Sequence, residues 1–166
     1  MLITHTRKNN IITETPTNLN NNSPNTMTTY GFKQRIMIGT WNVRTLSAPS
    51  RLEQVCKEFD SYKLDILGLS EIRWLDKGSK QLESGHTFIY SGNTSNRING
   101  VGILLSPKAK QSLIEYVPFS DRIVKARLNS KFRKITILQC YAPTEPDDEE
   151  TKENFYNQLE QPKKRK

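Results

Sequence analysis

The chain has 166 residues, of which 34% are hydrophobic and 25% are charged. This length suits one domain, and no apolar run approaches the roughly 20 residues that span a bilayer, so we expect a soluble protein with no membrane partner. The 25 basic and 17 acidic residues give a formal net charge of +8, which raises the question of a nucleic-acid partner.

The positive charge is concentrated at the two ends of the chain. Residues 1–34 are rich in asparagine and threonine and poor in apolar side chains, which predicts a disordered arm; its apolar start is too short for a signal peptide. Residues 161–166 form a basic tail. The predicted domain between them, residues 35–160, is nearly neutral, so a phosphate-binding surface there requires local clustering of basic side chains.

The predicted domain opens with a strand, a helix and a second strand. Residues 36–43 read as a β run, and Ser50 with Glu53 matches a capping box for a helix that extends to about residue 62. The helix carries one apolar stripe at helical spacing, made of Leu52, Val55, Cys56 and Phe59. Residues 66–69 are wholly apolar, as expected of a buried strand. A right-handed crossover would make the two strands parallel.

Strands dominate the next part of the chain. We predict two hairpins, residues 87–90 with residues 100–105, and residues 122–128 with residues 135–141. Pro146 and the four acidic residues after it predict the first turn of a last helix, which ends before Pro162. The pattern predicts an α/β fold with a mixed sheet and flanking helices.

The chain has two cysteines, Cys56 and Cys140. Neither has a second cysteine or a histidine at metal-ligand spacing. Cys56 lies on the apolar stripe of the predicted helix and Cys140 lies in a predicted strand. We therefore expect two buried, reduced thiols, which are typical of an intracellular protein.

Asn42 and Glu71 each follow a predicted strand. Parallel strands would deliver them to the same rim of the sheet. Mg²⁺ prefers oxygen ligands, usually one or two carboxylates with water and phosphate, so Glu71 is a candidate ligand. Each residue alone is weak support, because a carboxylate at a strand end is more often solvated or capping, and asparagine suits a turn.

Five motifs together carry a family resemblance. They are Thr40-Trp41-Asn42-Val43, Leu69-Ser70-Glu71-Ile72-Arg73-Trp74, Gly100-Val101-Gly102, Ser120-Asp121-Arg122-Ile123 and Tyr141-Ala142-Pro143. In this order they resemble the endonuclease/exonuclease/phosphatase superfamily, most closely the endonuclease domains of LINE-type retrotransposons and craniofacial development protein-like sequences. The resemblance covers residues 35–160.

The resemblance implies a fold, a cofactor and roles for three residues. The fold would be a four-layer α/β sandwich, of which this chain resembles the first half. Glu71 would bind Mg²⁺, Asn42 would orient the metal and phosphate, and Tyr141 would contact the scissile phosphate. Arg44 stands where some abasic-site endonucleases have a second carboxylate, which argues against an acidic second ligand there.

The later motifs of the family are absent from the sequence. It contains no Asp-x-Asn segment and no closing Ser-Asp-His, and its histidines are His5 and His86 alone. Ser120-Asp121 lacks the histidine, so we expect a turn role for it. We therefore expect a truncated, catalytically impaired domain. Its inner sheet face would lack a covering sheet and would be open to self-association or to a completing chain.

Other functions stay open at this point. DNA is the partner that the closeness to retrotransposon domains favours, but the superfamily also contains inositol-phosphate and lipid phosphodiesterases. A non-catalytic nucleic-acid-binding or protein-interaction module on the same half-domain is the main alternative. Six basic residues lie within residues 122–134 without an acidic one, either as a phosphate-tracking surface or as a solvated edge hairpin. The basic tail resembles a nuclear-import signal.

Overall fold

The computed structural model describes residues 2–5, 35–130 and 133–161. Most of the predicted arm and the end of the basic tail lie outside these ranges. Within the arm, Leu2–His5 forms strand β1, which pairs in parallel with strand β9, Ile135–Cys140. The prediction of a disordered arm therefore does not hold for these four residues.

The first sheet has five strands, in the order β2-β3-β6-β5-β4. Their bounds are Ile38–Asn42 for β2, Ile66–Ser70 for β3, Lys77–Gln81 for β4, Thr87–Ser91 for β5 and Val101–Leu105 for β6. β2 and β3 are parallel, as the β-α-β reading predicts, and β5 and β6 form the predicted antiparallel hairpin. β3 and β6 are buried along their whole length, which explains their uninterrupted apolar sequences.

The second sheet has four strands, in the order β1-β9-β8-β7. β7 spans Leu113–Ser120 and β8 spans Ile123–Leu128. β8 and β9 form the second predicted hairpin. The sequence reading missed β7, and it also missed the short helix α2, Pro107–Gln111, and strand β4.

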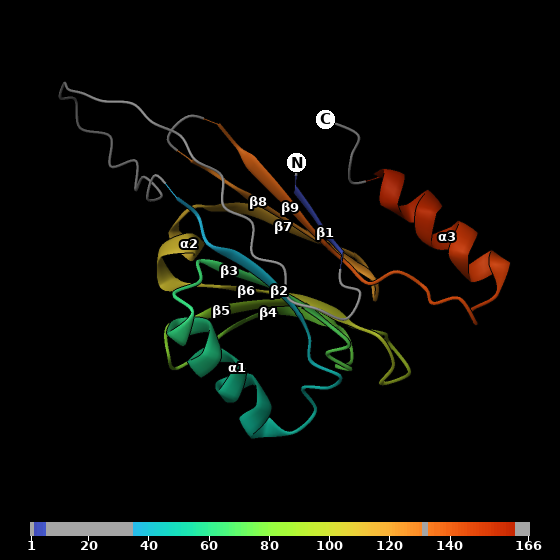
Figure 1. Ribbon diagram of the computed structural model, residues 1–166, viewed down its shortest axis with the longest axis horizontal. Helices are drawn as coiled ribbons and strands as arrows, with labels where there is room; N and C mark the ends of the chain where they lie inside the picture. The colour runs from blue at the N-terminus through green and yellow to red at the C-terminus, as the bar shows by residue number, and fades with distance from the viewer. Residues whose placement is uncertain (1, 6–34, 131–132, 162–166) are drawn as a thin grey trace.

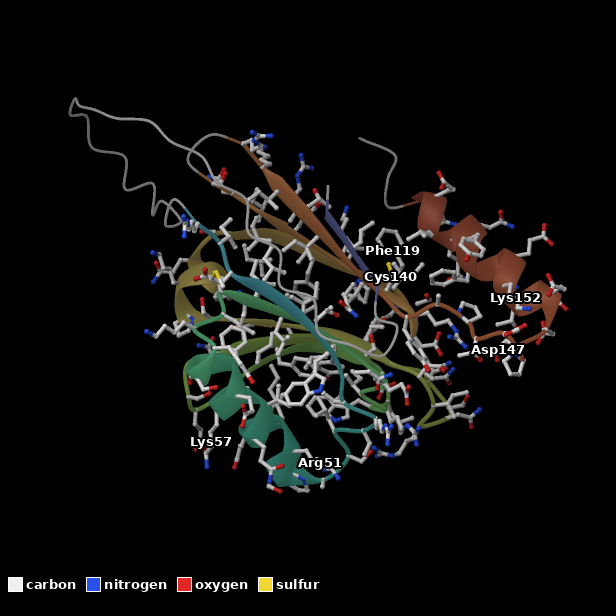
Figure 2. The ribbon with its side chains drawn as sticks, in the orientation of Figure 1. Arg51, Lys57, Phe119, Cys140, Asp147 and Lys152 are labelled. Atoms are coloured by element: carbon white, nitrogen blue, oxygen red, sulfur yellow. The ribbon has the colours of Figure 1, made fainter. Side chains whose placement is uncertain are left out.

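The two sheets pack face to face between two helices, which makes four layers (Figure 1). Helix α1, Pro49–Ser61, covers the outer face of the five-stranded sheet with the predicted apolar stripe. Helix α3, Glu149–Glu160, packs Phe155 on the outer face of the four-stranded sheet, near Phe119 and Cys140 (Figure 2). The α/β sandwich class is confirmed.

The inner face of the five-stranded sheet is covered by the second sheet of this same chain. Ile66, Ile89 and Ile103 on one sheet share a buried cluster with Ala126 and Ile137 on the other. The expectation of an open apolar face is therefore wrong, because strands that follow the first sheet in the sequence fold back over it.

Two helix starts differ from the predictions. The N-cap of α1 is Ala48, and no side chain caps this end, so the Ser50 and Glu53 capping box is wrong; Pro in the first turn sets the start instead. α3 begins at Glu149 after an Asp148 N-cap whose side chain accepts the Thr151 N–H, three residues beyond Pro146.

Both cysteines are free and buried, as expected. Cys56 belongs to the cluster under α1 and Cys140 to the cluster under α3. Burial raises the pKa of the Cys56 thiol, which keeps it protonated and unreactive at neutral pH. Among the described residues, none of the helices has the length and apolar character needed to cross a membrane.

Candidate active site

Asn42 and Glu71 meet at one rim of the five-stranded sheet because β2 and β3 are parallel neighbours. In the strand register Asn42 lies opposite Ser70, the residue before Glu71. The Asn42 amide Nδ2 donates a hydrogen bond to Glu71 Oε1 at 2.7 Å. The Asn42 Oδ1 accepts the backbone N–H of Arg44 at 3.0 Å, so the amide group is held at both ends.

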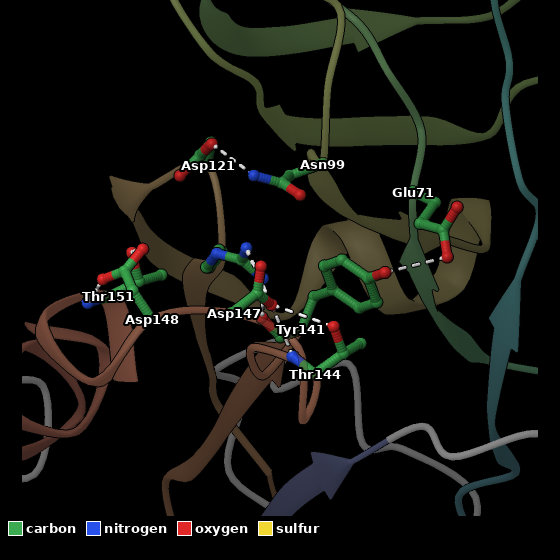
Figure 3. A network of polar contacts seen from close by, with 9 residues as sticks. Glu71, Asn99, Asp121, Tyr141, Thr144, Asp147, Asp148 and Thr151 are labelled. Carbon is green, nitrogen blue, oxygen red and sulfur yellow. Dashed lines mark hydrogen bonds and ion pairs between the residues drawn. The ribbon is translucent and has the colours of Figure 1, made fainter. Parts of the chain in front are cut away.

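Tyr141 reaches the same carboxylate from the second sheet. It follows β9, and its hydroxyl donates to Glu71 Oε1 at 2.9 Å (Figure 3). Beneath this contact the buried side chain of Gln139 donates to Ser70 Oγ at 2.9 Å, which joins the two sheets by a polar link. The three residues singled out in the sequence therefore lie together, although they come from two different sheets.

Arg73 is a fourth member of the site that sequence reasoning did not assign. Its guanidinium lies 3.2 Å from Glu71 Oε2. The Glu71 side chain is 18% exposed, and that of Arg73 is 47% exposed. Glu71 and Arg73 both have left-handed backbone, with φ of 56° and 55°. Nothing in the residue types predicts left-handed backbone at both Glu71 and Arg73, with Ile72 between them, so the contact could not be read from the spacing alone.

The neighbouring loops fix this rim. The Arg73 N–H donates to the Asn99 carbonyl and the Ile72 N–H to the Gly100 carbonyl. Gly100 has φ of 88°, and a Cβ at this position would lie 2.7 Å from an Ile72 side-chain carbon. The first glycine of the Gly100-Val101-Gly102 motif is thus explained by backbone conformation and close packing.

Asp121 holds two of these loops together. Its Oδ2 accepts hydrogen bonds from Asn99 at 3.1 Å and from Asn93 at 3.4 Å, and its carbonyl accepts the Gly100 N–H. Figure 3 shows the Asn99 contact beside the Glu71 site. The geometry agrees with a loop-holding role for the Ser120-Asp121 segment.

The charge state of the site follows from these contacts. Burial alone would raise the pKa of Glu71, but the hydrogen bonds from Asn42, Tyr141 and Arg73, with the Arg73 charge, hold it below the usual 4.5. Burial, with the hydrogen bond to Glu71 and its negative charge, raises the pKa of Tyr141 to about 12. At neutral pH the site therefore holds an ionised carboxylate and a protonated phenol.

The basic residues of the β8–β9 hairpin are partly used inside the fold. The Arg122 guanidinium lies over the Tyr141 ring, 5.4 Å from its centroid, and donates to the Tyr141 carbonyl at 3.2 Å. It also approaches Asp147 at 4.0 Å, and Lys125 pairs with Glu115 at 3.2 Å. These contacts favour the reading of a structural hairpin over a continuous phosphate-tracking surface.

His86 does not lie at the Glu71 site. The buried His86 contacts Ser84 at 2.9 Å and Asp60 at 3.0 Å. It precedes Thr87, the first residue of β5, which pairs with Leu105 of β6. Leu105 in turn pairs with Ile66, the first residue of β3. That is the opposite end of the strand from Glu71. His5 ends β1, in register with Cys140.

Glu71 is the carboxylate at this rim that could hold Mg²⁺. In the described part of the chain, no three His, Cys, Asp or Glu side chains form a group that could hold a metal. Glu71 is ionised, and its Oε1 is already shared by Asn42 and Tyr141. Its Oε2 contacts only the half-exposed Arg73 among the described hydrogen bonds. This donor set suits Mg²⁺ held by a single carboxylate, with water and phosphate as the other ligands.

Comparison with known proteins shows the family to which the chain belongs. The sequence profile of the "Endonuclease/Exonuclease/phosphatase family" matches residues 39–163, a range that contains Asn42, Glu71 and Tyr141. The chain belongs to the endonuclease/exonuclease/phosphatase family.

Two relatives of this family member are each named "Craniofacial development protein 2". The protein from Bos taurus is 34% identical over 128 residues, which cover 77% of this chain and 21% of the relative. The protein from Tragulus javanicus is also 34% identical over 128 residues, covering 77% of this chain and 22% of its own length. The chain therefore spans about a fifth of the curated relatives that it matches.

A solved structure supports the family fold. The AP endonuclease from Archaeoglobus fulgidus matches with a TM-score of 0.54 and 21% sequence identity, over 75% of this chain and 49% of that chain. At this identity the likeness concerns the fold. Together with the sequence profile, it accounts for the two stacked sheets of this family member.

Proposed function

We propose that this chain carries the Glu71 half of a Mg²⁺-dependent endonuclease site of retrotransposon type, and that it cleaves DNA weakly or not at all by itself. The observation that carries the proposal is the Glu71 carboxylate, which accepts hydrogen bonds from Asn42 and Tyr141 on opposite sheets. Such a group at a rim, kept ionised by its neighbours, suits a metal-assisted phosphodiesterase.

Each residue has a distinct task in this proposal. Glu71 holds Mg²⁺, which supplies positive charge to a phosphate oxygen when bound. Asn42 keeps the carboxylate oriented through its Nδ2 contact. Tyr141 presents its phenolic hydroxyl to the phosphate, and its high pKa keeps the proton on the oxygen at all physiological pH values. DNA is the proposed partner because the sequence motifs resemble those of retrotransposon endonuclease domains.

The proposed impairment follows from what a complete hydrolytic site needs. Cleavage requires a group that activates water and one that stabilises the leaving oxygen. The sequence has no Asp-x-Asn segment, and in the described residues His86 lies at the far end of the sheet. Loss of one such group usually lowers the rate by about 10²–10³, so loss of a set would leave little turnover.

Plasmid nicking tests this proposal. We expect the chain with Mg²⁺ to nick supercoiled plasmid at least about 10³-fold more slowly than the A. fulgidus AP endonuclease nicks the same plasmid with an abasic site. Any residual nicking should disappear with EDTA and in Glu71→Gln, which removes the charge but keeps the shape. Glu53→Gln, an exposed carboxylate on α1, is the matched control and should behave as the wild type.

Two results would count against this function. Nicking at the rate of the reference enzyme would disprove the impairment. Nicking that is unchanged in Glu71→Gln would disprove the assignment of the site. The alternative of a non-catalytic binding module gains support if Mg²⁺ changes nothing while DNA is retained in a salt-sensitive manner.

A further inference from the structure

A groove opens beside the Glu71 rim, between strand β2 and helix α1. Its volume is about 390 Å³, and Asn42 forms part of its lining. β2 is an edge strand, paired only with β3 within its sheet, so no further strand of the described residues covers its free side. The groove is therefore bounded by an edge strand on one wall and by the flank of a helix on the other.

The two walls carry different chemistry. Trp41 lines the strand wall and is 37% exposed, unlike the buried Thr40 before it, because alternate strand residues face opposite sides. Arg51, Gln54 and Glu58 line the helix wall. Their spacing of three and four places them along one flank of α1. An aromatic side chain thus stands opposite a row of polar side chains.

The end of the groove nearest the Glu71 rim is positively charged. Arg44 and Arg51 both line it. Arg44 has φ of 58° and is tied through its N–H to Asn42, while Arg51 lies in the first turn of α1. Neither guanidinium has an ion-pair partner among the described residues. Glu58 lies two turns further along α1, about 10 Å away along the axis.

We propose that this groove binds one nucleotide of the DNA strand that crosses the Glu71 rim, a proposal that rests on the proposed function. The base stacks on the exposed Trp41 ring, since base–aromatic stacking accepts any base. The phosphate lies against Arg44 and Arg51, whose guanidinium groups form charge-assisted hydrogen bonds with phosphate oxygens. The Glu58 charge disfavours phosphate at the other end and so sets the direction of the strand.

Intrinsic tryptophan fluorescence can test the groove directly. The chain has two tryptophans. Trp74 is partly buried, donates its indole N–H to the Leu46 carbonyl at 2.8 Å and packs against two aromatic rings. A probe that stacks in the groove should therefore quench Trp41. The probe is tetrathymidylate, titrated in EDTA so that binding is measured without hydrolysis.

We expect saturable quenching in the wild-type chain and its loss in Trp41→Phe. Arg44→Gln and Arg51→Gln should each weaken binding by about fivefold or more, because each removes a charged donor to phosphate. Lys57→Gln is the matched control, since it removes the same charge from an exposed position of the same helix. Figure 2 labels Arg51 and Lys57 on α1, and Arg51 lies nearer the loop that precedes the helix. The control should bind as the wild type.

Three outcomes would contradict nucleotide binding in the groove. They are no quenching, quenching that persists in Trp41→Phe, or equal weakening of binding by Lys57→Gln and Arg51→Gln. The last would indicate general charge attraction. Far-UV circular dichroism of each variant excludes unfolding as the cause. Because quenching is measured in EDTA and nicking in Mg²⁺, failures of the two proposals are distinguishable: loss of quenching contradicts the groove, whereas nicking that is unchanged in Glu71→Gln contradicts the proposed function.

Discussion

Glu71 is held by donors from three separate segments of the chain. Asn42 ends β2, Tyr141 follows β9, and Arg73 turns back from the loop after β3. Each donor stabilises the ionised carboxylate, which is why its pKa lies below the usual value despite burial. The side chain that would bind Mg²⁺ is thus also a structural centre of the rim.

The linkage between this carboxylate and folding gives a pH-dependent prediction. Because the folded state lowers the pKa of Glu71, its contribution to stability is complete above the ordinary value and is lost as the pH falls through the lowered one. Glu71→Gln should therefore lower the free energy of unfolding by about 1–2 kcal/mol at pH 7. This difference should shrink below pH 4.5 and vanish at lower pH.

Urea unfolding followed by circular dichroism at a series of pH values measures this difference. Glu53→Gln, whose carboxylate is exposed on α1, is the control and should show no such trend. A difference for Glu71→Gln that stays constant down to the lowest pH would mean that packing, and not charge, causes it.

At the scale of elements, the starts of α1 and α3 differ in side-chain capping. Asp148 accepts hydrogen bonds from the Thr151 N–H at 2.7 Å and from its hydroxyl at 2.9 Å, whereas Ser50 caps nothing. We predict that Asp148→Ala lowers the melting temperature and that Ser50→Ala leaves it unchanged. Thermal denaturation of both variants provides the comparison, and a larger loss for Ser50→Ala would contradict the observed helix starts.

The elements that the sequence predicted are those whose burial follows directly from their apolar residues. The apolar stripe of α1 is buried on one side of the helix, and the apolar runs of β3 and β6 are buried along the whole strand. The residue pattern alone therefore predicts these elements. β4 has the sequence Lys-Gly-Ser-Lys-Gln and is almost wholly exposed. It is a strand because it pairs with β5, and this pairing cannot be predicted from the local sequence pattern. β7 contains Pro118, which suits an edge strand but obscures the strand signal.

The sequence likewise predicted some residues of the candidate site and missed others. Strand ends next to Asn42 and Glu71, with the motif order, singled out these two residues and Tyr141, and the structure brings the three side chains together. Arg73 and the groove at Trp41 could not be found, because both depend on how loops and α1 sit on the sheet. Left-handed backbone at Arg44, Glu71 and Arg73 is a property of the packed rim, and arginine and glutamate rarely signal it.

At the scale of the whole molecule, the packed sheets replace the open face that sequence reasoning expected. Ile103 is fully buried between the sheets, while Ile98 is 52% exposed in the loop before β6. We predict that Ile103→Ala lowers the free energy of unfolding by about 2–5 kcal/mol. Ile98→Ala should change it by less than about 0.5 kcal/mol.

Equilibrium urea unfolding of both variants tests the sheet packing. The two substitutions remove the same side-chain atoms, so their difference isolates burial. Similar losses in the two variants would show that the sheets are not packed in solution as described.

The hydrogen bond between Tyr141 and Glu71 has a thermodynamic consequence for the molecule. It joins residues 70 positions apart and on different sheets, so the site exists only while the sheets are docked. A ligand that binds this site therefore acts as a clamp on the fold. By mass action, a ligand at one hundred times its dissociation constant would stabilise the folded chain by about 2.7 kcal/mol. Occupancy of the rim and resistance to unfolding should thus rise together.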